Sequence, residues 1–277
     1  MGSVRLRVGD LDRMAGFYGR ALGLRELGRG PSEVLLGTGD GRVLVELEGD
    51  PSAPVRPARS TGLFHQAILV PERADLAVAL RRVVGAGWSF TGASDHIVSE
   101  ALYLDDPEGN GIEIYRDRPR EEWRRTEGEL EMGTFPLDLA GVLGAADEGA
   151  PDEGMPDDTA MGHVHLQVRD VPEAEAFYAG GLGFAVTVRG YPGALFVSAG
   201  GYHHHLGLNT WGTRDAPPPP AGARGLARYR VLLPTQDDVA RLAARLDAAE
   251  IVAEPRDGGL ELVDPSGNRA LVESAPD

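Results

Sequence analysis

The chain repeats itself 160 positions apart, and this internal duplication constrains the fold more than any other feature. Residues 3–24 and residues 163–184 match without a gap: both have an alternating strand pattern that ends in Asp, a Phe-Tyr pair, and a Leu-Gly-apolar triplet. The two copies are therefore expected to fold alike. They differ at one chemically important position, where Ser3 of the first copy is replaced by the metal-capable His163 of the second.

Each copy divides again, which gives four modules that cover residues 3–50, 61–116, 161–211 and 226–274. Every module reads as a strand of period two, an amphipathic helix and several short strands. In module one Asp10 is expected to cap the helix and Gly23 to end it. Helices are predicted over 74–84 in module two and 238–249 in module four. The predicted fold class is α+β, with four βαβββ modules paired into two cup-shaped barrels.

The repeats also predict the domain organisation. Modules one and two form an N-terminal half over residues 1–124, and modules three and four form a C-terminal half over residues 161–277. Residues 125–160 are rich in Asp, Glu, Gly and Pro, and are expected to connect the halves, with one short helical pattern at 137–143.

Composition excludes several classes of function. The 277 residues include no cysteine, which excludes a thiolate zinc site and a cysteine nucleophile. No run of about 18 apolar residues occurs, so no membrane span is expected. The net charge of −16 argues against a nucleic-acid partner, which would need a basic face. A strand pattern begins within three residues of the N-terminus, so the cytoplasm is the expected location, and a homo-oligomer is an open expectation.

All seven histidines lie in modules two and three, at positions 65, 96, 163, 165, 203, 204 and 205. This asymmetry favours one functional site where modules two and three meet. Alternation along the strands then selects the residues that face the cup. The apolar residues of 164–168 face the helix, which turns His163 into the cup, and the same reasoning turns His65 and Glu113 inward.

Two histidines and one carboxylate that converge in this way form the facial triad of Fe(II) or Mn(II) sites. The equivalent positions in modules one and four are Ser3, Glu46, Arg228 and Leu271, a set that cannot hold a divalent metal. One metal site per chain is therefore predicted, with module two paired to module three and module one to module four. A glyoxalase-like alternative would use Glu46, His65 and Glu113, but it leaves His163 without a role.

Five stretches carry a resemblance to a known family: Gly62–Leu69, Asp95–Leu104, Asp106–Tyr115, Gly162–Val168 and Gly200–Trp211. They resemble the vicinal oxygen chelate (glyoxalase/bleomycin resistance/dioxygenase) superfamily. Within it the chain resembles type I extradiol dioxygenases most, and the bacterial catechol 2,3-dioxygenase group in particular. The best-known extradiol enzymes hold all three ligands in the C-terminal half, and this chain departs from that pattern.

The resemblance implies roles for single residues. His163, His65 and Glu113 resemble the three ligands of Fe(II), for which Mn(II) is the alternative. His204 resembles the acid/base of the pocket, whereas strand alternation alone favours His203 and His205 as the residues facing the cup. Tyr103 resembles the tyrosine that hydrogen-bonds the substrate oxygen, and His96 resembles a further polar residue of the pocket.

The implied function is Fe(II)-dependent extradiol cleavage of a small aromatic diol of the catechol type by O2. Cleavage of a hydroquinone-type ring is one alternative. A metal-dependent isomerase or lyase of the glyoxalase type would instead work with a redox-inert metal and consume no O2. A non-enzymatic small-molecule binding protein would need no metal triad.

Overall fold

Each of the four modules folds in the order strand, helix and three strands, as the repeats predict. Module one comprises β1 (Val4–Val8), α1 (Leu11–Arg20), β2 (Arg25–Arg29), β3 (Glu33–Gly37) and β4 (Val43–Gly49). Module two comprises β5 (Gly62–Leu69), α2 (Arg73–Gly85), β6 (Gly92–Asp95), β7 (Ser99–Asp105) and β8 (Gly111–Asp117). Module three comprises β12 (Ala160–Gln167), α4 (Val171–Glu175) continued by the π-helical turn η2 (Ala176–Gly181), β13 (Ala185–Val188), β14 (Ala194–Ser198) and β15 (Leu206–Asn209). Module four comprises β16 (Gly225–Leu233), α5 (Gln236–Ala248), β17 (Ala253–Arg256), β18 (Gly259–Val263) and β19 (Arg269–Ser274).

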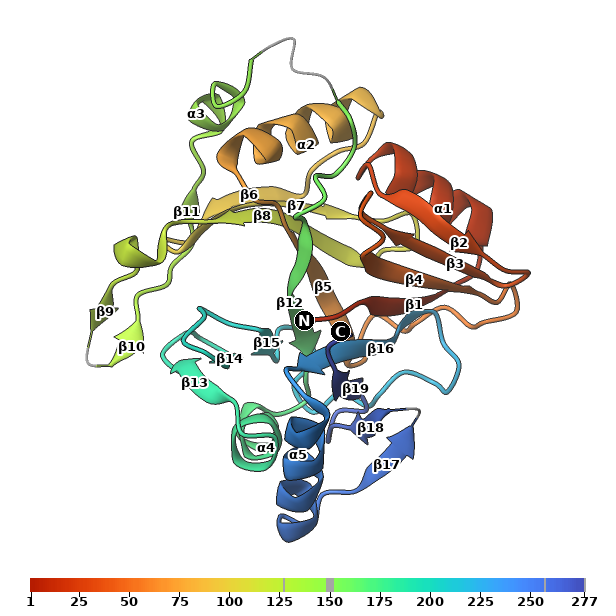
Figure 1. Ribbon diagram of the computed structural model, residues 1–277, viewed down its shortest axis with the longest axis vertical. Coiled ribbons are helices and arrows are strands. Elements are labelled where there is room, and N and C mark those ends of the chain that lie inside the picture. The colour runs from red at the N-terminus through yellow and green to blue at the C-terminus, as the bar shows by residue number, and fades with distance from the viewer. Residues whose placement is uncertain (127, 148–151, 257, 277) are drawn as a thin grey trace. The chain divides into compact units, whose positions relative to one another are not determined.

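This computed structural model describes residues 1–126, 128–147, 152–256 and 258–276 (Figure 1). The predicted connector, residues 125–160, includes residues 127 and 148–151, which lie outside the described residues. Its described part holds β9 (Arg125–Thr126), β10 (Glu129–Leu130), β11 (Phe135–Pro136) and α3 (Leu139–Leu143), and the 3-10 turn η1 (Arg120–Glu122) precedes it. The short helix confirms the pattern seen at 137–143.

The chain divides into two compact units. One holds Met1–Arg7, Ala53–Phe64 and His163–Asp277, and the other holds Val8–Ser52 and His65–Gly162. In the first unit the strands run in the orders β17-β18-β19-β16-β1 and β12-β15-β14-β13. In the second they run in the orders β11-β6-β7-β8-β5 and β4-β3-β2. β1 of module one pairs antiparallel with β16 of module four, as expected if these two modules share a sheet.

Modules two, three and four pair their first and last strands in parallel: β5 with β8, β12 with β15, and β16 with β19. The helix of each module supplies the connection that parallel strands need. α1 packs on β3 and β4, and α2 packs on β8 (Figure 1). The mixture of helices and sheets built from repeated modules confirms the α+β fold class.

The first helix begins where the sequence predicts. Asp10 caps α1, because its side chain accepts a hydrogen bond from the backbone N–H of Arg13 at 3.0 Å. Met14, Phe17 and Tyr18 then form a buried stripe at helical spacing. Gly23 has a φ of +76°, a backbone conformation that favours glycine directly after a helix.

A buried aspartate fixes the turn that leads into the last strand of module two. Oδ1 of Asp106 accepts the backbone N–H groups of Glu108 and Asn110, both at 2.9 Å. Oδ2 accepts the Asn110 amide at 2.8 Å and the Tyr18 hydroxyl at 3.1 Å. The Asp-Pro-x-Gly-Asn turn is thus tied to α1, and β8 starts in a fixed place.

We expect ionisation of Asp106 to cost stability as the pH rises. Burial raises the pKa of Asp106 to about 6, whereas an aspartate in an unfolded chain has a pKa of about 3.9. Between these values the folded protein binds more protons than the unfolded chain, so the free energy of unfolding falls with rising pH. Asp106→Asn cannot titrate and should lack this component. Urea unfolding of both proteins from about pH 4 to 7 measures it, and a wild-type-minus-variant difference that does not change with pH would contradict it.

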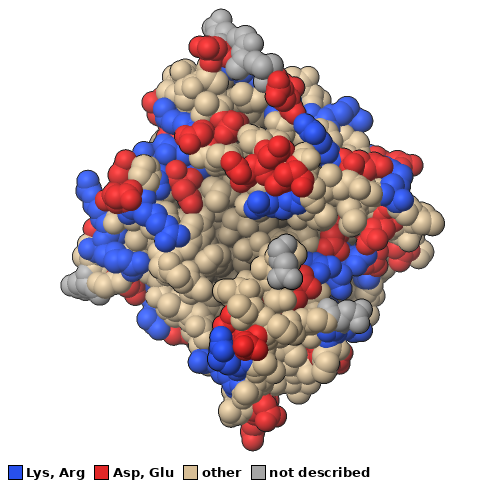
Figure 2. Space-filling model, in the orientation of Figure 1, with Lys and Arg blue, Asp and Glu red and all other residues tan. Residues whose placement is uncertain are grey.

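Charge on the face drawn in Figure 2 is mixed, with acidic and basic side chains interleaved over the surface. A nucleic-acid partner would need a continuous basic field, which this face does not present. Among the described residues, no helix is long and apolar enough to cross a membrane.

Candidate metal centre

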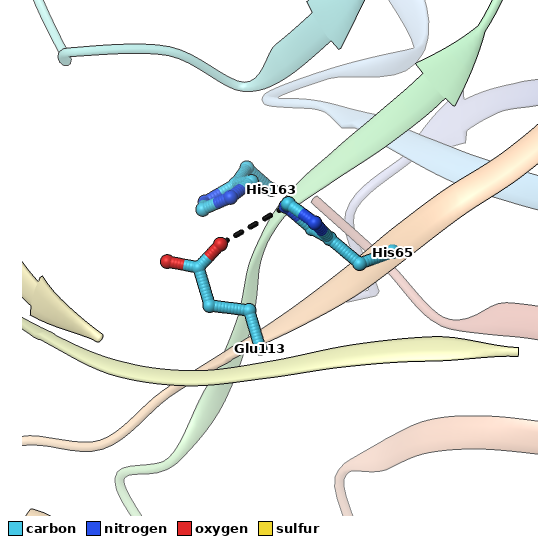
Figure 3. A group of neighbouring side chains, drawn as sticks. All are labelled: His65, Glu113 and His163. Carbon is cyan, nitrogen blue, oxygen red and sulfur yellow. Dashed lines mark ion pairs between the residues drawn. The ribbon is translucent and has the colours of Figure 1, made fainter. Parts of the chain in front are cut away.

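The ligand atoms of His65, Glu113 and His163 lie within 4.8 Å of one another (Figure 3). His65 lies on β5 and Glu113 on the parallel neighbour β8, where Glu113 is in register with Ala67, two residues beyond His65. Side chains two residues apart on a strand point to the same face, so both turn inward. All three side chains are buried, at 6%, 2% and 2% exposed. The structure therefore brings the three predicted ligands together.

A glycine precedes the third ligand. Gly162 belongs to the same strand as His163, and a Cβ at Gly162 would collide with the Tyr115 hydroxyl. Only a residue without a side chain can pass so close to Tyr115. Gly162 thereby places the backbone from which the His163 side chain leaves β12.

The donor set suits a divalent transition metal. Nε2 of His65 and Oε2 of Glu113 are 2.9 Å apart. Adjacent ligands on an octahedral ion with bonds of about 2.1 Å are separated by about 3.0 Å, so this pair already has the required spacing. Two imidazoles and one carboxylate form the set that binds non-haem iron with positions left open for other ligands. Among the described residues, no second group with metal-ligand spacing occurs, and Glu46 is not part of this one.

Tyr103 and His96 form a hydrogen-bonded pair beside the ligands. Tyr103 is in register with Glu113 on the neighbouring strand, and its ring centroid lies 5.6 Å from that of His65. Its hydroxyl is 2.6 Å from His96 Nε2, and His96 Nδ1 is 2.7 Å from the carbonyl oxygen of Gly133. Because a carbonyl only accepts, Nδ1 of His96 donates, and in the neutral ring Nε2 accepts the Tyr103 proton. The proton of Tyr103 is therefore directed to His96, which makes the phenolic oxygen an acceptor toward other groups.

The loop that carries His96 is held in a strained form. Ile97 has a φ of +73°, which is rare for a β-branched residue, and the side chain of Asp95 accepts its backbone N–H at 2.8 Å. The Asp95 carboxylate also forms an ion pair with Arg118, with Oδ2 of Asp95 2.6 Å from Nη2 of Arg118. Backbone strain of this kind occurs where the surrounding contacts fix a functional side chain. No pattern in the sequence indicates this loop geometry.

The three consecutive histidines occupy different places. The His204 ring lies 4.1 Å from that of His163, whereas the His203 ring lies 6.0 Å from it. His203 stacks on Tyr202 at 4.0 Å, and its Nδ1 is 2.7 Å from Nδ1 of His204. His205 turns its Nδ1 to the backbone N–H of Ala199 at 3.2 Å. The His204 ring is therefore closer to a predicted ligand than the His203 ring is.

Strand alternation cannot decide among these histidines, because β15 begins only at Leu206. Residues 203–205 lie in an irregular segment that precedes the strand. The side chains of such a segment do not alternate between two faces. Strand alternation therefore gives no basis for the expectation that His203 and His205 face the cup together.

Aromatic side chains that sequence reasoning missed surround His165, which is itself buried. Its ring lies 5.1 Å from Phe64, 5.7 Å from Phe196 and 5.6 Å from Trp211. Phe196 also contacts the His204 ring at 4.9 Å. These residues are scattered along the sequence, and only folding gathers them. They form an aromatic wall that extends from His204 to the partly exposed Trp211.

The chain belongs to the Glyoxalase/Bleomycin resistance protein/Dioxygenase superfamily, whose model matches residues 1–114 and 160–271. It is 46% identical over 270 residues to a catechol-2,3-dioxygenase of Bacillus subtilis (strain 168), with 96% of this chain and 93% of that protein aligned. Among solved structures, the fold is similar to a putative dioxygenase from Bacillus subtilis subsp. subtilis str. 168, with a TM-score of 0.69 and 17% identity over 100% of this chain and 86% of that one. It is also similar to glyoxalase I from Zea mays, with a TM-score of 0.62 and 20% identity, and the match covers 99% of this chain and 92% of that one.

Proposed function

We propose that this chain is an extradiol dioxygenase that opens the ring of a catechol-type substrate with O2, using Fe(II) held by His65, Glu113 and His163. The buried group of two imidazoles and one carboxylate carries the proposal. The 46% identity to a protein named catechol-2,3-dioxygenase supports the substrate class. Iron is preferred to Mn(II) only as the first metal to test, because both accept this donor set.

Iron in this site would supply binding of both catechol oxygens and activation of O2. The protein groups would prepare and hold the substrate. His204 is suited to exchange a proton with a substrate hydroxyl, since an imidazole titrates near neutral pH. Tyr103 directs its proton to His96 and can accept a hydrogen bond from that hydroxyl. The aromatic wall around His165 offers a flat apolar surface to an aromatic ring and limits the access of water.

Oxygen uptake tests the proposal directly. Protein stripped of metal and reloaded with Fe(II) or Mn(II) is expected to consume one O2 for each catechol and to give a ring-opened product. The panel should hold catechol, a substituted catechol and a hydroquinone, so that the position of the second hydroxyl is tested too. Protein reloaded with Ni(II), Co(II) or Zn(II) is the matched control and should consume no O2.

Two other outcomes would replace the proposal. Isomerase or lyase activity with Ni(II), Co(II) or Zn(II), without O2 uptake, would identify a glyoxalase-type enzyme, which the similarity of fold to glyoxalase I allows. Tight binding of a small molecule with no turnover under any metal would identify a binding protein. The buried triad counts against the second outcome, because simple sequestration needs no such ligands.

A further inference from the structure

The two halves bury corresponding positions in and next to their helices to different extents. α2 and α5 match 163 positions apart, as their capping boxes at Glu72/Asp75 and Thr235/Asp238 show. In the second half the positions compared next line a cleft beside α5, and the corresponding cleft of the first half lies beside α2. Leu22, Leu24, Val70 and Ala79 are buried in the first half, whereas their counterparts Leu182, Phe184, Leu233 and Leu242 are only partly buried in the second.

A segment of the connector covers this cleft in the first half. Asp152 accepts Arg82 Nε at 2.7 Å and Arg82 Nη2 at 2.5 Å, and the Gly154 carbonyl accepts the same Nη2 at 2.7 Å. One residue further on, the backbone N–H of Met155 donates to the Gly23 carbonyl at 3.0 Å, and the Met155 side chain is buried. A carboxylate, the backbone of a bend and a buried apolar side chain thus cover this cleft, next to a pocket of about 450 Å³ that is lined by Arg82 and Asp152 among others.

The equivalent cleft of the second half is open. It forms a pocket of about 440 Å³, lined by Gly183, Phe184, Leu233, Leu242 and Arg245 among others. Arg245, the counterpart of Arg82, is exposed and donates to the carbonyls of Gly180 and Gly181, both at 2.7 Å. In the described part of the chain Arg245 meets no carboxylate, and Gly183, the counterpart of Gly23, accepts no backbone N–H.

We propose that this pocket binds a short peptide segment of a partner protein, with an acidic side chain followed about three residues later by an apolar one. The acidic group would pair with Arg245, a backbone N–H would donate to Gly183, and the apolar side chain would enter between Phe184 and Leu242. The first half of the same chain supplies the template, since Asp152 and Met155 make the first two of these contacts with equivalent residues and the Met155 side chain is buried. The proposal is independent of the activity proposed above.

The occupant is taken to be another protein rather than a second copy of this chain. The chain's own segment of this type, Asp152–Met155, already pairs with Arg82. A second copy would also bring a net charge of −16 toward an equal one, which opposes association over short distances. A short acidic and apolar segment from another protein brings far less negative charge and therefore meets less repulsion.

A synthetic peptide provides the test. The probe is acetyl-Asp-Glu-Gly-Met-Pro-Asp-amide, which copies residues 152–157, added to the full-length ¹⁵N- and methyl-labelled protein. Saturable NMR shifts are expected at Gly183, Phe184 and Leu242, with a dissociation constant near the millimolar range because the segment is short and flexible. Peptides with Asn for the first Asp, or Ser for Met, should bind about tenfold more weakly or not at all.

Protein variants distinguish a loss of the contact between Arg245 and the peptide from a loss of folding. Arg245→Gln should weaken the peptide about tenfold or more, because a charge-assisted hydrogen bond is lost. Arg245 also holds two carbonyls, so Leu242→Asp is the second variant: it leaves those contacts in place and sets a like charge against the peptide. Arg29→Gln removes an exposed arginine of module one and should leave binding unchanged.

Three results would overturn the proposal. One is the absence of saturable shifts at the pocket up to about 10 mM peptide, a limit set by the millimolar affinity expected. Another is binding that both Arg245→Gln and the Asn peptide leave unchanged. The third is a dimer in sedimentation that Leu242→Asp dissociates, which would show that a second copy covers this face.

Discussion

The Glu113→Ala variant is expected to retain no transition metal and to show ring cleavage at background level. Glu113 supplies the one negative charge of the three-ligand group, and two imidazoles alone would hold iron far more weakly. The variant should still fold, because it removes a buried carboxylate whose burial is itself costly without a cation. Metal analysis after iron loading, circular dichroism and oxygen uptake measure the three parts of this expectation.

Glu46→Ala is the matched control for this experiment. Glu46 occupies the position of module one that corresponds to Glu113, and it is also buried, at 5% exposed. Its removal should leave one metal per chain. If instead Glu46→Ala and Glu113→Ala both lose the metal while His163→Ala keeps it, the ligands would be the glyoxalase-like set of Glu46, His65 and Glu113, and His163 would lose its role.

The internal duplication and the alternation of side chains along the strands predicted much of the fold. The 160-residue repeat predicted four βαβββ modules, because a repeated pattern of capped helix and alternating strands must bury the same faces in each copy. Alternation also brought His65 and Glu113 to one face, since both lie within regular strands of one parallel pair. His163 was found by comparing it with Ser3, a difference visible only because the copies align without a gap.

Irregular backbone limited how much of the remaining structure could be predicted from the sequence. Alternation fails at His203–His205 because these residues precede β15, and it cannot describe Ile97, whose φ is positive. The division into an N-terminal half (1–124) and a C-terminal half (161–277) stays a prediction, as do the cytoplasmic location and the oligomeric state. The contact of Asp152–Met155 with Arg82 could not be predicted from the sequence either, because the long-range contacts of a connector leave no periodic pattern of residues.

His204→Ala is expected to lower ring cleavage about 10²–10⁴-fold while the iron content stays at the wild-type level. His204 is no member of the three-ligand group, yet its ring lies 4.1 Å from that of His163. An imidazole at this place can exchange a proton with a bound substrate, and its removal leaves the metal ligands intact. Tyr103→Phe should have a smaller effect, because it removes one hydrogen bond and no titrating group near neutral pH. Iron analysis and steady-state oxygen uptake on each variant measure the two quantities.

Controls at neighbouring histidines make this result specific. His165→Ala removes a buried ring of the aromatic wall and should raise KM more than it lowers kcat, since the wall is proposed to hold the substrate ring. His203→Ala removes the partner 2.7 Å from Nδ1 of His204. It should shift the pH profile of turnover but retain more activity than His204→Ala, because the His203 ring lies farther from His163, at 6.0 Å. Wild-type turnover by His204→Ala, together with loss of activity in His203→Ala or His205→Ala, would move the acid/base role away from His204. The irregular segment before β15 would then have to present its side chains differently once substrate is bound.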